Sequence, residues 1–377
     1  MARRPRFITV ETAVPPSTPP KSVVVSGLLT DGAGSVDLTS AGFGTVDAAI
    51  LFSSQANTTD NPQAGSAIFV GLWDGINTVQ HAVGGFSQDD ALNSNTSRCH
   101  VTDKVLAYPI NTGDGIALSY TCSNTTDGIT LTYVAGATSV QRHVTAILIS
   151  GATDVHLATQ NLGTGTSAID ITAPGFKPDI VFFASAGMPF TGAAIELVSS
   201  IGVAHNSSTD TVTQGFVGVS SVDNQVATVS NSYITHSRCV GQIYNNTISW
   251  EASVSDFDSS GFSITPDAST SSDLVSYLAI QLADPDDAWV DVVTAPTSTG
   301  DNSTTGLGFA PDVVGFFAPL TTTLESLAQN GSFHFSASGD KTGQSYACLD
   351  EDAAQPPHAT SRCVTNNKAL ALFDDDG

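Results

Sequence analysis

Basic residues are scarce in this 377-residue sequence. Lys and Arg total 12 against 36 Asp and Glu, only five of these acids are Glu, and the formal net charge is −24. Proteins that bind nucleic acid need clustered cations to contact phosphates, so nucleic acid is excluded as a partner. Low Lys with Asp-dominated acidity favours a halophilic protein, because the Debye length shrinks to roughly 3 Å near 1 M salt. The plainer interpretation is a soluble acidic protein.

Long hydrophobic runs are also lacking. No stretch reaches the roughly 20 apolar residues of a membrane-spanning helix, so no membrane insertion is expected. The first residues, "MARRPRFITVETAVPPSTPP", lack the apolar core of a signal peptide, so no cleaved leader is expected either. Helical periodicity is almost absent; "TTTLESLAQNG" at 321–331 is the one stretch compatible with two helical turns.

Motifs for catalysis, cofactors or metals are missing. The eight His residues form no HExxH or HxxxH spacing, and no CxxC, GxSxG, phosphate-loop or dinucleotide pattern occurs. Carboxylates are so abundant that a glycosidase pair cannot be singled out. The cluster "DPDDAWVD" at 284–291 suits either calcium or a hydrated linker. We therefore predict a protein that is not an enzyme, with no catalytic residue, no cofactor and no metal site.

A repeated turn is the strongest positive signal. "GFKPDIVFFASA" begins at Gly175, "GFAPDVVGFFAP" begins at Gly308, and a weaker form, "GFGTVDAAILFSS", begins at Gly42. Both spacings between these glycines are 133 residues. A period of that length indicates a whole domain copied three times in tandem.

Each copy contains about eight short strand-like segments separated by Gly, Asn, Asp and Pro turns. This pattern predicts an all-β chain of tandem β-sandwich, jelly-roll-like domains. The predicted organisation is an arm (1–21), two complete sandwiches (22–151 and 152–285) and a partial third (286–377). The third copy lacks its closing strands, and we expect either a longer native polypeptide, which we favour, or strands supplied by another chain.

Ser-Arg-Cys or its equivalent recurs once per copy. The pairs are Arg98–Cys99, Arg238–Cys239 and Arg362–Cys363, although only four Arg lie outside the arm. A structural role predicts equivalent, at least half-buried guanidinium groups bonded to loop carbonyls or an Asp. The functional alternative is a site for an anion or a glycan carboxylate. The structural role is favoured because no aromatic side chain or second cation recurs beside the Arg.

The five Cys residues allow no disulfide pattern that serves all copies, because Cys122 and Cys348 each occur in one copy only. Small buried apolar residues are the favoured interpretation. A Cys348–Cys363 bridge stays open if their strands are neighbours.

The Gly-Phe-x-Pro-Asp turn, its apolar strand and the closing strands resemble jelly-roll-like domains of tailed-virus virion proteins. Gly175–Asp179 and Gly308–Asp312 carry the turn, whereas the first copy lacks the Pro and has Asp47 one place later. The resemblance covers roughly residues 22–377 and implies a head turret or spike, a tail fibre or a baseplate appendage. With the acidic composition, it points to a virus of salt-loving archaea.

The N-terminal arm suits attachment. Arg3, Arg4, Arg6 and Phe7 precede the Pro-rich "VPPSTPPK", which is a stiff, extended linker. A basic tip on an acidic chain predicts binding to capsid, portal or tail subunits of the virion; an ordinary disordered terminus is the plainer alternative. The expected location is the particle, after synthesis in the host cytoplasm, as a homo-oligomer around a three- or fivefold axis that contacts a host-surface glycan or glycoprotein.

A second function class stays open: an extracellular carbohydrate-binding or carbohydrate-degrading β-sandwich protein. A repeated sugar site needs exposed aromatic residues at equivalent positions. Trp73, Trp250 and Trp289 fall at non-equivalent places in the repeat, which weighs against this class.

Overall fold

The computed structural model describes residues 21–29, 32–88, 92–109, 115–136, 141–268, 272–291, 293, 305, 307–319, 321, 323–339, 342–350 and 360–366. These residues form antiparallel β-sheets, with a single 3-10 turn, η1 (Pro285–Asp287), and no α-helix. The all-β prediction is therefore confirmed. The stretch 321–331, which was compatible with two helical turns, is not helical: its described residues form a turn that leads into strand β24 (Ala328–Gln329).

The first repeat is a sandwich of a six-stranded and a four-stranded sheet. The larger sheet has the order β1 (Lys21–Leu29), β11 (Arg142–Ser150), β3 (Ala48–Ser53), β5 (Ser66–Asp74), β6 (Val79–Ser87) and β7 (Thr96–Val101). The smaller sheet has the order β2 (Ser35–Thr39), β10 (Gly128–Gly136), β9 (Ile116–Thr125) and β8 (Leu106–Pro109).

The second repeat has the same strand order. Its larger sheet is β12 (Asp154–Asn161), β22 (Leu274–Gln281), β14 (Ile180–Ser185), β16 (Leu197–Asn206), β17 (Val212–Ser221) and β18 (Ser230–Thr235). Its smaller sheet is β13 (Ile169–Ile171), β21 (Gly261–Pro266), β20 (Thr247–Asp258) and β19 (Val240–Tyr244). Ten strands take the place of a jelly roll's eight, and the finer jelly-roll likeness stays a prediction.

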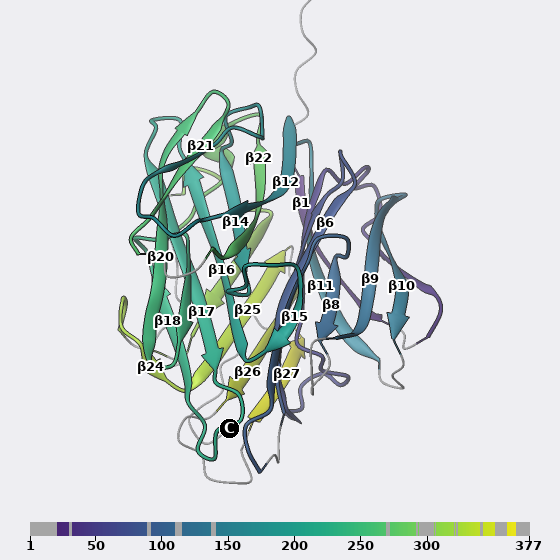
Figure 1. The fold of residues 1–377 in the computed structure, drawn as a ribbon. Coiled ribbons are helices and arrows are strands. Elements are labelled where there is room, and N and C mark those ends of the chain that lie inside the picture. The colour runs from purple at the N-terminus through teal and green to yellow at the C-terminus, as the bar shows by residue number, and fades with distance from the viewer. Residues whose placement is uncertain are drawn as a thin grey trace, which may run out of the picture.

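The third repeat is represented by one sheet. Strands β23 (Val313–Ala318), β25 (Gly331–Gly339), β26 (Thr342–Asp350) and β27 (Thr360–Asn366) correspond to β3, β5, β6 and β7 of the first repeat. Figure 1 shows these late strands, in yellow, between the blue first sandwich and the green second one.

Short strands exchanged between repeats link the three large sheets in a cycle. Strand β15 (Gly192–Ile195) of the second repeat extends the first repeat's sheet at β7, and β24 of the third repeat extends the second repeat's sheet at β18. Strand β4 (Gln63–Ala64) of the first repeat closes the cycle at β27. The repeats are therefore arranged as around a threefold axis within one chain.

The hydrophobic core has two levels. One central cluster joins all three repeats and includes Phe52, Ile280 and Phe335. Separate clusters fill the first and second sandwiches between their sheets. Strand β3 is buried along its whole length, because alternate side chains enter the central cluster and the sandwich cluster. This explains its unbroken apolar sequence.

The repeated Gly-Phe turn leads into this central strand. Gly42, Gly175 and Gly308 have φ values of 76°, 76° and 80°, a left-handed conformation that favours glycine. The Asp after the turn comes directly before the strand. Asp47 accepts hydrogen bonds from the Gly151 and Ala152 N–H groups at 2.6 and 3.1 Å, beyond the repeat's last strand. In the first and second repeats, the Asp after the turn therefore ties the beginning of the central strand to the end of the repeat.

Candidate functional site: the seams between repeats

The first seam joins the first and second repeats at Arg98. Arg98 on β7 is paired with Ala194 of β15, and its guanidinium lies 3.7 Å from Glu196 of the second repeat. Tyr244 donates to the same carboxylate at 2.5 Å. The Arg98 side chain is only 13% exposed, and this burial lowers its pKa. Arg98 therefore sits at an inter-repeat contact.

The closing seam, between the third and first repeats, has the same arrangement. Arg362 on β27 is paired with Gln63 of β4, and its Nη1 donates to the Gly65 carbonyl at 3.1 Å. Arg98 and Arg362 thus occupy equivalent positions: each lies on the strand that receives the neighbouring repeat's short strand, and each contacts that repeat. A nearby backbone bond from Asp60 N–H to the Val364 carbonyl, at 2.7 Å, strengthens this closure.

Arg238 is not equivalent to the other two, so that part of the prediction is wrong. The residue opposite the inserted strand in the second repeat is Ser232, which pairs with Ala328 of β24. Arg238 follows β18 and comes just before β19. Cys239 likewise corresponds to Val105 of the first repeat, because both carbonyls lie against equivalent glycines, Gly202 and Gly71. The Arg-Cys dipeptide recurs in the sequence, but in the second repeat it does not occupy the structural position that it has in the first and third repeats.

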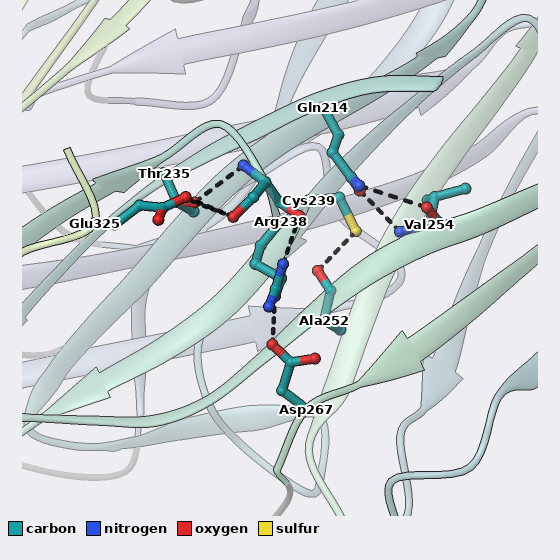
Figure 2. A network of polar contacts seen from close by, with 9 residues as sticks. Gln214, Thr235, Arg238, Cys239, Ala252, Val254, Asp267 and Glu325 are labelled. Atoms are coloured by element: carbon teal, nitrogen blue, oxygen red, sulfur yellow. Dashed lines mark hydrogen bonds and ion pairs between the residues drawn. The ribbon is translucent and has the colours of Figure 1, made fainter. Parts of the chain in front are cut away.

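Arg238 nonetheless belongs to a polar network at the second seam, between the second and third repeats. Its guanidinium forms an ion pair with Asp267 and donates to the Ser237 carbonyl at 2.9 Å. Thr235 and Ser237 both donate to Glu325 of the third repeat, at 3.2 and 2.6 Å. Figure 2 shows Glu325 at the left, beside Thr235, and Asp267 at the lower end of the Arg238 side chain. All three motifs therefore lie where two repeats meet. Arg98 and Arg362 do so on a strand that receives a short strand of the neighbouring repeat, and Arg238 does so on the loop between β18 and β19.

The surroundings of Cys99 and Cys239 indicate a structural role. Cys99 and Cys239 are fully buried and donate to the carbonyls of Ala107 and Ala252, both at 3.3 Å. Burial raises the pKa of the Cys99 thiol to about 12 and that of Cys239 further. Such thiols stay protonated at neutral pH and are poor nucleophiles.

The Cys348–Cys363 bridge, which stayed open if the two strands were neighbours, is not formed, although β26 and β27 do pair. Cys363 forms no disulfide, and it pairs with Ala347 across β26 and β27.

A buried cluster of His and Ser at the first seam escaped the sequence analysis. The Ser276 hydroxyl on β22 lies 2.9 Å from His81 Nδ1 and 2.7 Å from His100 Nε2. Burial lowers the pKa of His81 to about 3, with a contribution from His100, and that of His100 to about 4. Both rings are therefore neutral above that range. No local spacing could reveal this cluster, because two repeats supply its members.

The closing seam has a related contact. The Thr145 hydroxyl on β11 lies 2.8 Å from the Tyr346 hydroxyl of the third repeat. Thr145 corresponds to Ser276, since both lie four residues before the last residue paired with the central strand. A hydroxyl of the last long strand thus contacts a different repeat at two of the seams.

The remaining predicted sites are the N-terminal arm, a metal site and the acidic cluster at 284–291. Arg3, Arg4, Arg6 and Phe7 lie outside the described residues. Within the described part of the chain, no group of three or more His, Cys, Asp or Glu is placed to hold a metal ion, and no helix is long and apolar enough to cross a membrane. At the former calcium candidate, Asp286 accepts from the Ser208 backbone and hydroxyl.

No protein-family model, curated protein or solved structure matches the chain. The seams described above are therefore the basis on which its function is inferred.

Proposed function

We propose that this chain is a structural component of a virus particle, an outward-projecting appendage such as a head turret, spike or tail fibre. The observation that carries the proposal is the cyclic exchange of β15, β24 and β4 among the three repeats. It links tandem domains through backbone hydrogen bonds, in addition to the covalent connections between them.

Such linkage suits a mechanical role. Domains joined only by linkers move independently unless a large apolar interface holds them. Here a central cluster contributed by all three repeats holds the large sheets together, and polar contacts occupy the seams. An appendage exposed outside a particle benefits from a body that resists local opening.

The candidate residues are used in these contacts. Arg98 and Arg362 bind groups of the neighbouring repeat, and Glu325 binds the loop that carries Arg238. The structural interpretation of the arginines is thereby supported over an anion or glycan site.

The carbohydrate-binding alternative gains no support from the aromatic residues. Trp73 and Trp250 are 0% and 2% exposed inside the two sandwiches, and Trp289 alone among the three is exposed. A repeated sugar site would need aromatic faces open to solvent at equivalent positions.

In this proposal the arm attaches the chain to capsid, portal or tail subunits, and copies of the chain gather around a three- or fivefold axis. The acidic surface suits a particle in concentrated salt. The distal end contacts a host-surface glycan or glycoprotein.

The test is to locate the protein in purified particles. Gold-labelled antibodies against residues 22–285 should decorate intact virions at regular positions, and peptides of the chain should co-purify with the major capsid protein through a density gradient. Antibodies blocked with the purified protein serve as the control. Recovery only from infected-cell lysate, with bare particles, would reject the proposal.

A further inference from the structure

The first seam is held by a row of polar side chains on and just before β7. Alternate residues from 94 to 100 contact the second repeat, as expected for side chains on one face of a strand. These contacts are Ser94 Oγ with the Val222 carbonyl (2.7 Å), Thr96 Oγ1 with the Ser221 carbonyl (3.2 Å), Arg98 with Glu196 (3.7 Å) and His100 Nε2 with Ser276 Oγ (2.7 Å). Polar contacts therefore hold this seam beside the apolar central cluster.

The buried imidazole pair distinguishes this seam from the other two. In the second and third repeats the register gives Ile234 and Val364 in place of His100. The residues in place of His81 are Gly215 and Gln344. Among the described residues at these positions, only those of the first seam can therefore gain a charge in acid.

One hydroxyl joins the two rings. Ser276 Oγ lies 2.9 Å from His81 Nδ1 and 2.7 Å from His100 Nε2, and all three side chains are buried. The hydroxyl carries one hydrogen, so it can donate to one neutral ring and accept from the other. Protonation of both rings brings two cationic N–H groups to one oxygen in a place without water. The cluster therefore fits two neutral rings.

The charged groups around the cluster do not offset such charges. They are Arg98 on β7, Asp74 at the end of β5, His156 on β12, Glu196 between β15 and β16 with its partner Tyr244 on β19, and Asp273 just before β22. Glu196 and Asp273 act on Arg98, and Asp74 acts on His156; His205 of β16 lies against the Pro285 carbonyl instead. Burial lowers the pKa of both cluster rings, the His100 ring lowers that of His81 further, and no carboxylate among the described residues raises either.

The backbone at this seam is also held in an unfavourable conformation. One left-handed residue follows each exchanged strand: Gly65 after β4, Glu196 after β15 and Asn330 after β24, with φ values of 84°, 73° and 79°. Gly and Asn adopt this conformation readily, whereas Glu does not. The contacts of the Glu196 carboxylate with Arg98 and Tyr244 hold it there. Release of β15 from β7 therefore relieves strain at the first seam.

We propose that the first seam opens reversibly in acid: protonation of His81 and His100 releases β15 from β7, while the other two seams and both sandwiches stay closed. The cycle of sheets then becomes a linear arrangement. In it the first repeat stays joined to the third through β4 and to the second through residues 151–153. This inference goes beyond the proposed virion role and does not depend on it.

The direction of the pH dependence follows from proton uptake. The closed-seam pKa values, about 3 for His81 and about 4 for His100, lie below the ordinary value of 6.5 that the rings regain in water. The open seam therefore binds more protons below pH 6.5, and each ring favours opening by about tenfold per pH unit until its closed-seam value is reached. Between pH 7 and pH 5 the ratio of open to closed seams should rise at least about a hundredfold.

Hydrogen exchange of the full chain at pH 7 and pH 5, in the same salt and corrected for the intrinsic exchange rate, tests this proposal. Protection of the paired residues 97–100 and 192–195 should fall about a hundredfold at pH 5 and recover on return to pH 7. The other two exchanged strands serve as internal controls. Their protection should stay constant at residues 231–232, 328–329, 63–64 and 361–362.

Variants assign the effect to the two rings. His81→Gln/His100→Gln keeps a hydrogen-bonding side chain at both places and cannot gain charge, so protection at 97–100 should be equal at both pH values. Each single variant should keep about a tenfold fall, which allows the test even if the double variant folds poorly. Constant protection of the wild type at the first seam, an equal fall at all three seams, or an unchanged fall in the variants would overturn the proposal.

Discussion

The carboxylate of Asp47 accepts the backbone N–H of Gly151 at 2.6 Å, which joins the beginning of the first repeat's central strand to the end of its last strand. The two residues are 104 positions apart in the sequence. The Asp179–Leu282 bond repeats this link in the second sandwich. The Asp after the Gly-Phe turn therefore joins the two ends of the repeat, and this shared contact explains why the turn recurs.

Replacing Asp47 tests that closure. Burial raises the pKa of Asp47 against the opposing effect of its two backbone bonds, so an uncharged acceptor should replace it well. We expect Asp47→Ala to lower the free energy of unfolding by about 1–3 kcal/mol and Asp47→Asn by clearly less. Urea denaturation measures both. Asp154→Ala, at an exposed position, is the control, and equal losses for Ala at both sites would contradict the link.

Acid should weaken the first seam through His81 and His100. Their folded pKa values, about 3 and about 4, lie below the ordinary value of 6.5. The unfolded chain therefore binds more protons between these values, so the stability from these groups is complete above about pH 6.5 and is lost as the pH falls toward 4. The Tm of the double variant His81→Gln/His100→Gln should fall less steeply over this range than that of the wild type. A parallel fall in the two proteins argues against the cluster.

The two arginine geometries should differ in energy. Arg98 is more buried than Arg238, whose side chain is 30% exposed. Removing Arg98 leaves the Glu196 carboxylate at a buried seam, and we expect Arg98→Ala to cost about 1–3 kcal/mol. Arg238→Ala should cost less than about 1 kcal/mol, because an exposed ion pair contributes little. Thermal unfolding of both variants checks the order, and a reversed order would mean that the Asp267 contact dominates.

Salt should stabilise the protein. With a net charge of −24, carboxylates repel over a longer range as the Debye length grows from roughly 3 Å at 1 M to about 10 Å at 0.1 M. We expect Tm to fall steadily over this dilution. Sodium chloride and potassium chloride should act alike if screening is the cause. A Tm that stays constant or rises at low salt rejects the halophilic hypothesis.

Deleting residues 2–14 tests the arm, which lies outside the described residues. Since the sandwiches begin at Lys21, we expect the Tm of the truncated protein to match that of the full chain. Its incorporation into particles should be lost, as measured by the ratio of this chain to the major capsid protein. Replacing Arg3, Arg4 and Arg6 by Gln should reduce incorporation less, because ion pairs are weak in high salt. Normal occupancy of the truncated protein would place the anchor elsewhere.

The sequence by itself determined the strands, the turns and the repeat. Period-two patterns and turn residues are local signals, and the two equal spacings between Gly42, Gly175 and Gly308 reveal a repeated domain without any tertiary information. The spacing of the motifs also indicates that Arg98 and Arg238 are not equivalent: they are 140 positions apart, whereas Gly42 and Gly175 are 133 apart. A motif out of phase with its repeat does not occupy an equivalent position.

Only the tertiary structure decided how the repeats join. The exchanged strands β15, β24 and β4 are two to four residues long, too short for a periodic signal, and their partners lie in another repeat. The same holds for Ser276 with His81 and His100: each residue is ordinary in its own strand, and their contact exists because two sheets pack face to face. Local pattern fixes the strands, whereas packing between distant segments fixes the seams.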